Sequence, residues 1–181
     1  VSLDNNLELI NYLTFFDFRI SNNRIYFINY AFHGQYWRLI TPIFLHFGLM
    51  HIAFNLALLW FVGQRIELIH GRTRMLGITL MIGFASNLMQ AYFTEPSVFG
   101  GMSGVVYGLL GYGWIWSILR PAKSLHIPNA IVYFSLFMMV VGFTGLIDKL
   151  GIGKIANLAH LGGLIMGCFV GLGAVLIDKR Q

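Results

Sequence analysis

The chain has 181 residues, of which 57% are hydrophobic and only 10% charged, and its mean hydropathy is +0.70. These values exclude an ordinary water-soluble domain and indicate an integral membrane protein. The formal net charge is +5, but the basic residues lie between apolar stretches instead of forming one patch. We therefore interpret the charge as a signal of membrane orientation, and we expect no nucleic-acid partner.

Residues 1–40 carry scattered polar side chains among Leu, Ile, Phe and Tyr, without an apolar run of about 18 residues. This pattern predicts an amphipathic loop region at the outer face of the membrane rather than a span. The region ends at Tyr36-Trp37-Arg38, an aromatic and basic group suited to the headgroup level of the bilayer. Arg38 has two interpretations: it contacts a lipid phosphate, or it caps nearby backbone carbonyls.

Five apolar stretches follow, each of about 20 residues and long enough to cross a bilayer: 43–63, 75–93, 102–119, 128–147 and 155–177. Seven Lys or Arg residues lie in the linkers after the first and third stretches and in the C-terminal tail, whereas the other two linkers carry only two. The positive-inside bias places these seven in the cytoplasm and residues 1–40 outside. We therefore expect a further span upstream of Val1, which makes an all-α, six-span membrane domain.

Strongly polar residues inside the apolar stretches concentrate in the first halves of the first, third and fifth stretches: His46, His51, Asn55, Ser103, Asn157 and His160. Polar groups at such depth are costly and indicate function by default. Because these three stretches run in the same direction, they bring their polar groups to one depth near the outer face. His51 and Asn55 are four residues apart and so share one helical face.

Ser103 follows Gly100 and Gly101 and precedes Gly104. The glycines allow close approach of backbone to the Ser103 hydroxyl, and a helix beginning there directs unpaired N–H groups and its positive dipole end to the same place. A nucleophile and its developing oxyanion require this environment. The alternative is that Ser103 only caps the helix.

Small residues form one ridge on each of two spans: Gly163, Gly167 and Gly171 after His160, and Gly104, Gly108 and Gly111 after Ser103. Packing these ridges against each other would bring His160 beside Ser103, within the distance that a general base needs. The alternative is that the glycines serve packing alone and that His160 bonds a neighbouring carbonyl.

Four motifs in this order resemble those of the rhomboid intramembrane proteases, most closely their bacterial members, and cover residues 36–177: Trp37-Arg38, His46 to Asn55, Gly101 to Tyr107, and Ala156 to Gly163 with Gly167. The resemblance implies a polytopic rhomboid-like helical bundle in the bacterial inner membrane. It also implies a serine endopeptidase that cleaves single-span membrane proteins near the periplasmic face. Neither a cofactor nor a metal is implied; the partners are transmembrane protein substrates and membrane lipid.

The resemblance further implies individual roles. Ser103 is the expected nucleophile and His160 the expected base of a catalytic dyad, with Tyr107 packed under the imidazole. His51, Asn55 and the backbone N–H of Ser103 are the expected oxyanion hole. Structural support is expected from a further set of residues: Trp37, Arg38, His46, Gly101, Gly104, Asn157, Gly163 and Gly167.

Two other functions stay open. A non-catalytic rhomboid-like factor would bind membrane proteins without cleaving them, although such relatives usually lack the nucleophile or the base. A small channel or metal transporter would use His46, His51 and His160 as ligands, but sites of that kind usually add carboxylates or Cys. Elsewhere, we expect His70 to be solvated in a linker, and Asn87 and Gln90 to form interhelical hydrogen bonds.

Overall fold

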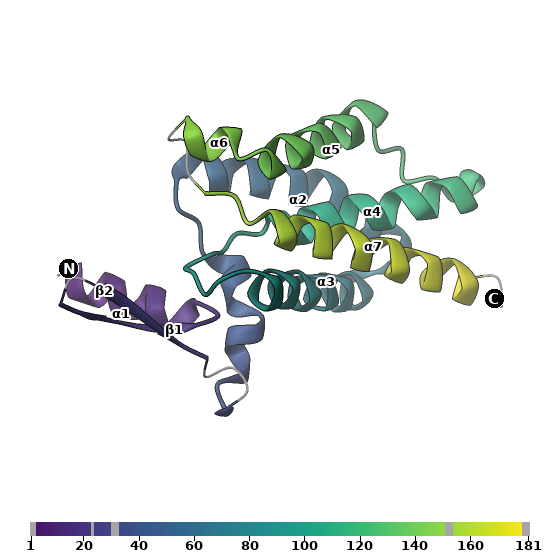
Figure 1. The fold of residues 1–181 in the computed structure, drawn as a ribbon. Coiled ribbons are helices and arrows are strands. Elements are labelled where there is room, and N and C mark those ends of the chain that lie inside the picture. Colours follow the sequence, from purple (N-terminus) through teal and green to yellow (C-terminus); the bar gives the residue numbers. More distant parts are fainter. Residues whose placement is uncertain (1–2, 23, 30–32, 151–153, 179–181) are drawn as a thin grey trace.

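The structure is a computed structural model that describes residues 3–22, 24–29, 33–150 and 154–178. Its body is a bundle of apolar helices: α2 (Leu49–His70), α3 (Arg72–Phe93), α4 (Ser103–Leu119), α5 (Asn129–Phe143) and α7 (Asn157–Asp178). Helices α2, α4 and α7 all begin at the end of the bundle nearest α1 and run toward the end where the chain terminates (Figure 1). The expected helical membrane bundle is thereby confirmed.

The helices differ in length from the expected spans. Helices α2, α3 and α7 have 22 residues each and are long and apolar enough to cross a membrane. Helices α4 and α5 are apolar but shorter, with 17 and 15 residues. Helix α5 ends at Phe143, before the expected residue 147, because Gly145 adopts a left-handed φ of +69° that interrupts the helix. The short helix α6 (Leu146–Lys149) follows.

Helix α2 begins six residues later than the apolar stretch 43–63 indicated, at Leu49. Pro42 lies at the start of a 3-10 helix, η3 (Thr41–Phe44), and Leu45 is extended. A second 3-10 helix, η2 (Tyr36–Leu39), precedes it. Because proline has no N–H and fixes its φ, the apolar run starts in a tight turn instead of an α-helix. At its other end α2 continues past residue 63 to His70.

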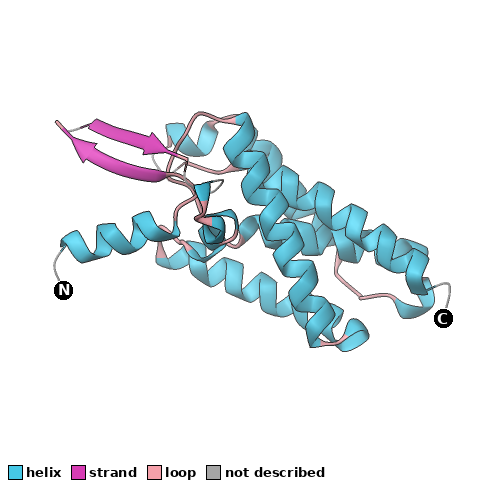
Figure 2. Ribbon diagram, turned by 90° about the horizontal axis from the view of Figure 1, so that it is seen from below, coloured by secondary structure: helices cyan, strands magenta, loops and turns pink. Residues whose placement is uncertain are grey.

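The N-terminal region contains α1 (Leu3–Leu13) and an antiparallel hairpin that the sequence analysis did not predict. Strand β1 (Asp17–Ser21) pairs with β2 (Arg24–Ile28), with Asp17 opposite Ile28 and Ser21 opposite Arg24. Both elements project from the end of the bundle where α2, α4 and α7 begin (Figures 1 and 2). Large apolar side chains on the hairpin are exposed, Ile20 and Ile25 among them, as in segments that lie at a membrane surface.

Helix α4 is the centre of the core. Val105, Leu109 and Tyr112 are fully buried, and α7 makes the most extensive contact with α4 among the described elements. A Cβ atom added to Gly163 would collide with the carbonyl oxygen of Gly104, so the two backbones touch. The two glycine ridges therefore pack against each other, as expected from their spacing.

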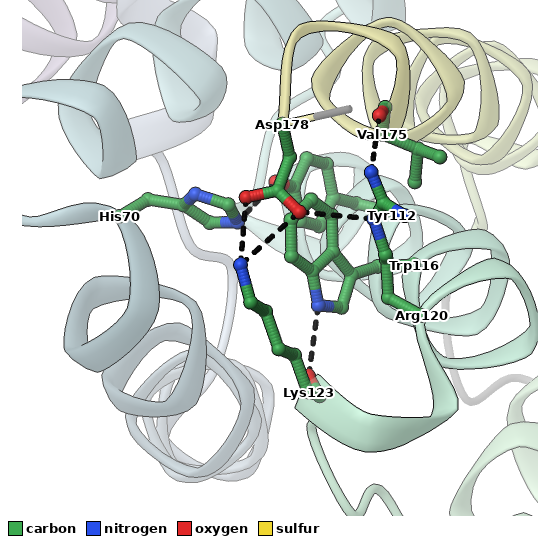
Figure 3. A network of polar contacts seen from close by, with 7 residues as sticks. All are labelled: His70, Tyr112, Trp116, Arg120, Lys123, Val175 and Asp178. Atoms are coloured by element: carbon green, nitrogen blue, oxygen red, sulfur yellow. Dashed lines mark hydrogen bonds and ion pairs between the residues drawn. The ribbon is translucent and has the colours of Figure 1, made fainter. Parts of the chain in front are cut away.

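A polar cluster joins the far ends of α2, α4 and α7 (Figure 3). The carboxylate of Asp178 forms ion pairs with Arg120 and Lys123, each at 2.9 Å. Trp116 is fully buried, and its indole N–H donates to the backbone oxygen of Lys123 at 2.9 Å. These contacts fix the C-terminal end of α7 to the loop that follows α4.

His70 belongs to this cluster, and the expectation of a solvated His70 is wrong. Its Nε2 is 2.7 Å from the hydroxyl of Tyr112, and its ring lies edge-on to Trp116 with centroids 4.5 Å apart. The reason is the length of α2, because a helix that extends to residue 70 carries this side chain back over α4 (Figure 3).

Candidate active site

Ser103 and His160 meet where α4 and α7 begin. Ser103 is the first residue of α4 and His160 lies in the first turn of α7, and the distance from Ser103 Oγ to His160 Nε2 is 2.8 Å. The contact follows from the glycine packing, since the backbones of Gly104, next to Ser103, and Gly163, three residues after His160, touch each other. The juxtaposition expected from the ridges is confirmed.

The hydroxyl of Ser103 is not a helix cap. The N-cap position of α4 belongs to Met102, and no side chain caps this terminus. The first N–H groups of an α-helix have no partner within the helix, so the start of α4 directs unpaired donors and a positive dipole end toward the Ser103 position. Of the two interpretations of Ser103, the geometry favours a hydroxyl engaged by an imidazole.

The imidazole of His160 is held by stacking. Its ring lies over Tyr107 with centroids 4.5 Å apart and 25° between the planes. Tyr107, one turn after Ser103 on α4, donates its own hydroxyl to the backbone oxygen of Ser135 on α5 at 2.7 Å. The Nδ1 atom of His160 is buried and has no hydrogen-bond partner among the described residues. The aromatic stack and the serine therefore orient the ring, without a carboxylate on Nδ1.

Gly101 separates the Ser103 hydroxyl from a second histidine. Its φ is +123°, and a Cβ atom there would lie 2.7 Å from His51 Nε2 and 3.6 Å from Ser103 Oγ. Glycine is thus required both by the positive φ of the backbone and by the lack of room for a side chain next to His51. The His51 ring consequently lies close to the place where a group bonded to Ser103 would be.

His46 fixes the approach to α4. Its Nε2 atom accepts a hydrogen bond from the backbone N–H of Met102 at 3.3 Å, and its ring meets that of His51 edge-on with centroids 4.9 Å apart.

Within the described residues, no group of three or more His, Cys, Asp or Glu side chains is placed to hold a metal ion.

Asn55 supplies a buried amide without a partner. It follows His51 by one helical turn on α2, is only 5% exposed, and its Nδ2 forms no hydrogen bond with the described residues. Leaving such a donor unpaired costs about 1–3 kcal/mol. This unpaired donor is available to a group that arrives later.

Helix α3 positions the residue before His160. Gln90 accepts from the backbone N–H of Ala159 at 3.1 Å, and Ser86 donates to the oxygen of the same residue at 2.9 Å. The interhelical bond expected for Gln90 is therefore present. Asn87 instead bonds the 3-10 segment, through the oxygen of Leu39 at 3.0 Å. Sequence reasoning missed Ser86, because a serine within an apolar helix has no distinctive spacing.

Arg38 caps carbonyls, which was one of its two interpretations. Its guanidinium donates to the backbone oxygens of Asn11 and Thr14, the latter at 2.8 Å, and its Nε donates to Gln35 at 2.6 Å. Burial lowers the pKa of Arg38, and the nearby charge of Asp17 opposes that effect. Arg38 thus anchors the end of α1 to the segment that leads into the bundle.

The remaining support residues join neighbouring elements. Trp37 donates its indole N–H to the oxygen of Tyr12 at 3.1 Å and stacks on the Tyr12 ring with centroids 5.1 Å apart. Asn157, the first residue of α7, packs closely on Gly142. A Cβ atom added to Gly142 would collide with the side-chain oxygen of Asn157. Asn157 therefore sets the separation between the end of α5 and the start of α7.

Comparison with known proteins identifies the family. Residues 33–176 match the model of the rhomboid domain. The relatives include the rhomboid protease GlpG of Photorhabdus laumondii, 39% identical over 140 residues, which make up 77% of this chain and 48% of the relative. The rhomboid proteases GlpG of Yersinia pestis and Serratia proteamaculans are each 38% identical over 133 residues, 74% of this chain and 46% of the relative. The chain thus spans about half the length of the curated relatives it matches. With a family match over most of its length and the paired serine and histidine in place, this chain belongs to the rhomboid family.

Proposed function

We propose that this chain forms one membrane domain of an intramembrane serine endopeptidase, with Ser103 as the nucleophile and His160 as the general base. The observation that carries the proposal is the 2.8 Å distance between Ser103 Oγ and His160 Nε2 at the N-terminus of α4. Membership of a family whose relatives are named rhomboid proteases supports the same assignment.

The chemistry proceeds in two halves. His160 Nε2 takes the proton of the Ser103 hydroxyl as Oγ bonds to the scissile carbonyl carbon, and the imidazolium then gives that proton to the departing amine as the C–N bond breaks. The product is an acyl-enzyme on Ser103. Water attacks the ester with His160 again as base, which releases the carboxylic acid and restores the Ser103 hydroxyl.

The negative charge that develops on the scissile carbonyl oxygen needs hydrogen-bond donors to stabilise it. The backbone N–H of Ser103 and the side chains of His51 and Asn55 fill this role in our proposal, supported by the unpaired buried Nδ2 of Asn55. In soluble serine proteases one such donor contributes about 2.7–4 kcal/mol to transition-state stabilisation. Because no cofactor or metal takes part in these steps, the activity needs neither.

Tyr107 and the support residues act through position. Tyr107 stacks under the imidazole of His160 and keeps the Nε2 atom of His160 directed at Ser103. The glycines at the α4–α7 contact keep the two helices at the separation that this bond requires. The other support residues hold the segments around the site: Trp37, Arg38, His46, Gly101 and Asn157.

The substrates in our proposal are single-span membrane proteins, cleaved near the periplasmic face of the bacterial inner membrane. Ser103 and His160 lie in the first turns of α4 and α7, at the end of the bundle where α2 also begins (Figure 1). The basic side chains Arg120 and Lys123 follow the last turn of α4 and pair with Asp178, the last residue of α7 (Figure 3). The positive-inside bias supports this orientation.

The test is covalent labelling combined with cleavage. A fluorophosphonate probe is expected to label the wild-type protein in detergent and to fail with Ser103→Ala, and the same variant is expected to lose cleavage of a single-span substrate. Ser97→Ala, in the loop between α3 and α4, is the matched control and keeps both properties. Cleavage by Ser103→Ala at the wild-type rate contradicts the assignment. Absence of labelling and cleavage in the folded wild-type protein favours a non-catalytic binding factor.

A further inference from the structure

An open groove lies at the end of the molecule away from the dyad. Its volume is about 420 Å³, and it separates the last turns of α2 from the loop that links α4 to α5. The lining residues are Gln64, Arg65, Leu68, Ile69, Ser124, Leu125 and His126. None of these residues takes part in the chemistry proposed above.

Arg65 gives the groove a positive charge. Its guanidinium carbon lies 3.7 Å from the centre of the Phe61 ring, and it donates one hydrogen bond to the backbone oxygen of Phe61. Among the described residues the ion pairs join Arg72 to Glu67, and Arg120 and Lys123 to Asp178. No described carboxylate therefore neutralises Arg65, and the guanidinium keeps donors for a further acceptor.

The opposite wall is ordered and adds polar groups without negative charge. Leu125 is buried, with 3% exposure, and its N–H donates to Ser117 at 3.2 Å, which ties the loop to α4. Ser124 Oγ accepts the N–H of His126 at 3.2 Å, so the Ser124 hydroxyl proton is available to an acceptor. The chemistry of the lining suits an anion.

Exposed apolar side chains of α2 lie on both sides of Arg65 along the helix axis, Leu68 toward the end of the helix and Trp60 toward the membrane centre. Leu68 is 84% exposed and Trp60, two turns earlier on the same face, is 72% exposed. A helix rises 1.5 Å per residue, so Arg65 lies about 24 Å along α2 from Leu49, at the headgroup level of the leaflet opposite the dyad. A ligand with an anionic head and an apolar tail matches both parts of this surface.

We propose that the groove binds an anionic phospholipid, with its phosphate on Arg65 and Ser124 and an acyl chain that runs toward the membrane centre along Trp60. A basic pocket beside a membrane helix attracts such headgroups, and the planar guanidinium suits a phosphate oxygen pair. The assignment does not depend on cleavage by Ser103, so it is tested separately.

The experiment is native mass spectrometry of the full chain in a neutral detergent, titrated with dioleoyl phosphatidylglycerol or dioleoyl phosphatidylcholine. Phosphatidylglycerol is expected to bind more tightly, and Arg65→Gln is expected to weaken its binding about fivefold without changing that of phosphatidylcholine. Arg72→Gln removes the same charge from an exposed residue at the same end of α2 and α3, and it is expected to change binding less than about twofold.

A second variant guards against a folding defect. Leu68→Glu places a negative charge on the groove wall. Leu68 is 84% exposed, so this substitution disturbs little packing. It is expected to weaken the binding of phosphatidylglycerol as Arg65→Gln does. Equal binding of the two lipids, no effect of either groove variant, or an equal loss in Arg72→Gln overturns the proposal. If inorganic phosphate displaces bound phosphatidylglycerol as effectively as added phosphatidylglycerol does, the groove is assigned to a free anion. A protein dimer that disappears in Arg65→Gln assigns it to a second copy of the chain.

Discussion

A methyl group added at Gly163 is expected to disable the dyad while the bundle stays folded. In the present packing a Cβ atom on Gly163 would lie 2.8 Å from the carbonyl carbon of Gly104 and collide with its oxygen. Both neighbours are backbone atoms of α4, so neither has a rotamer that relieves the contact. Helices α4 and α7 must move apart to accommodate Gly163→Ala.

The size of this movement follows from van der Waals distances. Carbon atoms in contact lie about 3.5–4.0 Å apart, so from 2.8 Å the two backbones must separate by about 1 Å. Because Ser103 and His160 lie beside this contact, their 2.8 Å bond lengthens toward about 3.8 Å, beyond the reach of a general base. A misplacement of about 1 Å lowers catalysis about 100-fold, whereas overpacking destabilises the fold by about 1–3 kcal/mol.

Gly173→Ala, on the same helix, is the matched control, since a Cβ atom at Gly173 has no neighbour within 4 Å. It is expected to leave activity unchanged and to stabilise α7 by about 0.5–1 kcal/mol. The assay compares fluorophosphonate labelling and substrate cleavage with thermal unfolding in the same detergent. Wild-type cleavage by Gly163→Ala, or an equal loss in Gly173→Ala, refutes the link between the helix contact and the dyad.

Three further substitutions separate catalysis from stability. Asn55→Ala is expected to lower the cleavage rate about 100-fold or more with little change in melting temperature, because Asn55 Nδ2 has no partner among the described residues; a large loss of stability would contradict this. Tyr107→Phe keeps the ring but removes its hydrogen bond to the Ser135 oxygen, which still accepts the helical N–H within α5, so unfolding should become easier by about 0.5–1.5 kcal/mol, with labelling of Ser103 largely retained. Asp178→Asn removes the carboxylate of the polar cluster in Figure 3 and should lower the melting temperature, less so at high salt, without affecting labelling; equal melting curves for variant and wild type would argue against a structural role for these ion pairs.

Composition and spacing determined a large part of this protein. The apolar stretches identified the helices of a membrane bundle, and the positions of His51, Ser103 and His160 indicated one shared depth. The glycines of α4 and α7 predicted the contact that brings Ser103 to His160, since small residues four apart permit backbones to touch. These inferences succeed because helical periodicity and membrane burial act locally along the chain.

Helix ends, the N-terminal hairpin and the surroundings of His70 were decided by the tertiary structure. Hydropathy does not report where a helix stops, so the 3-10 turn at Pro42 and the continuation of α2 to His70 shifted its bounds. His70 meets Tyr112 and Trp116 only because that continuation carries it across α4. Likewise, the stacking that orients His160 and the unpaired amide of Asn55 depend on which helices are neighbours. Periodicity assigns a residue to a face of its own helix, but the partner facing it is selected by packing between helices distant in the chain.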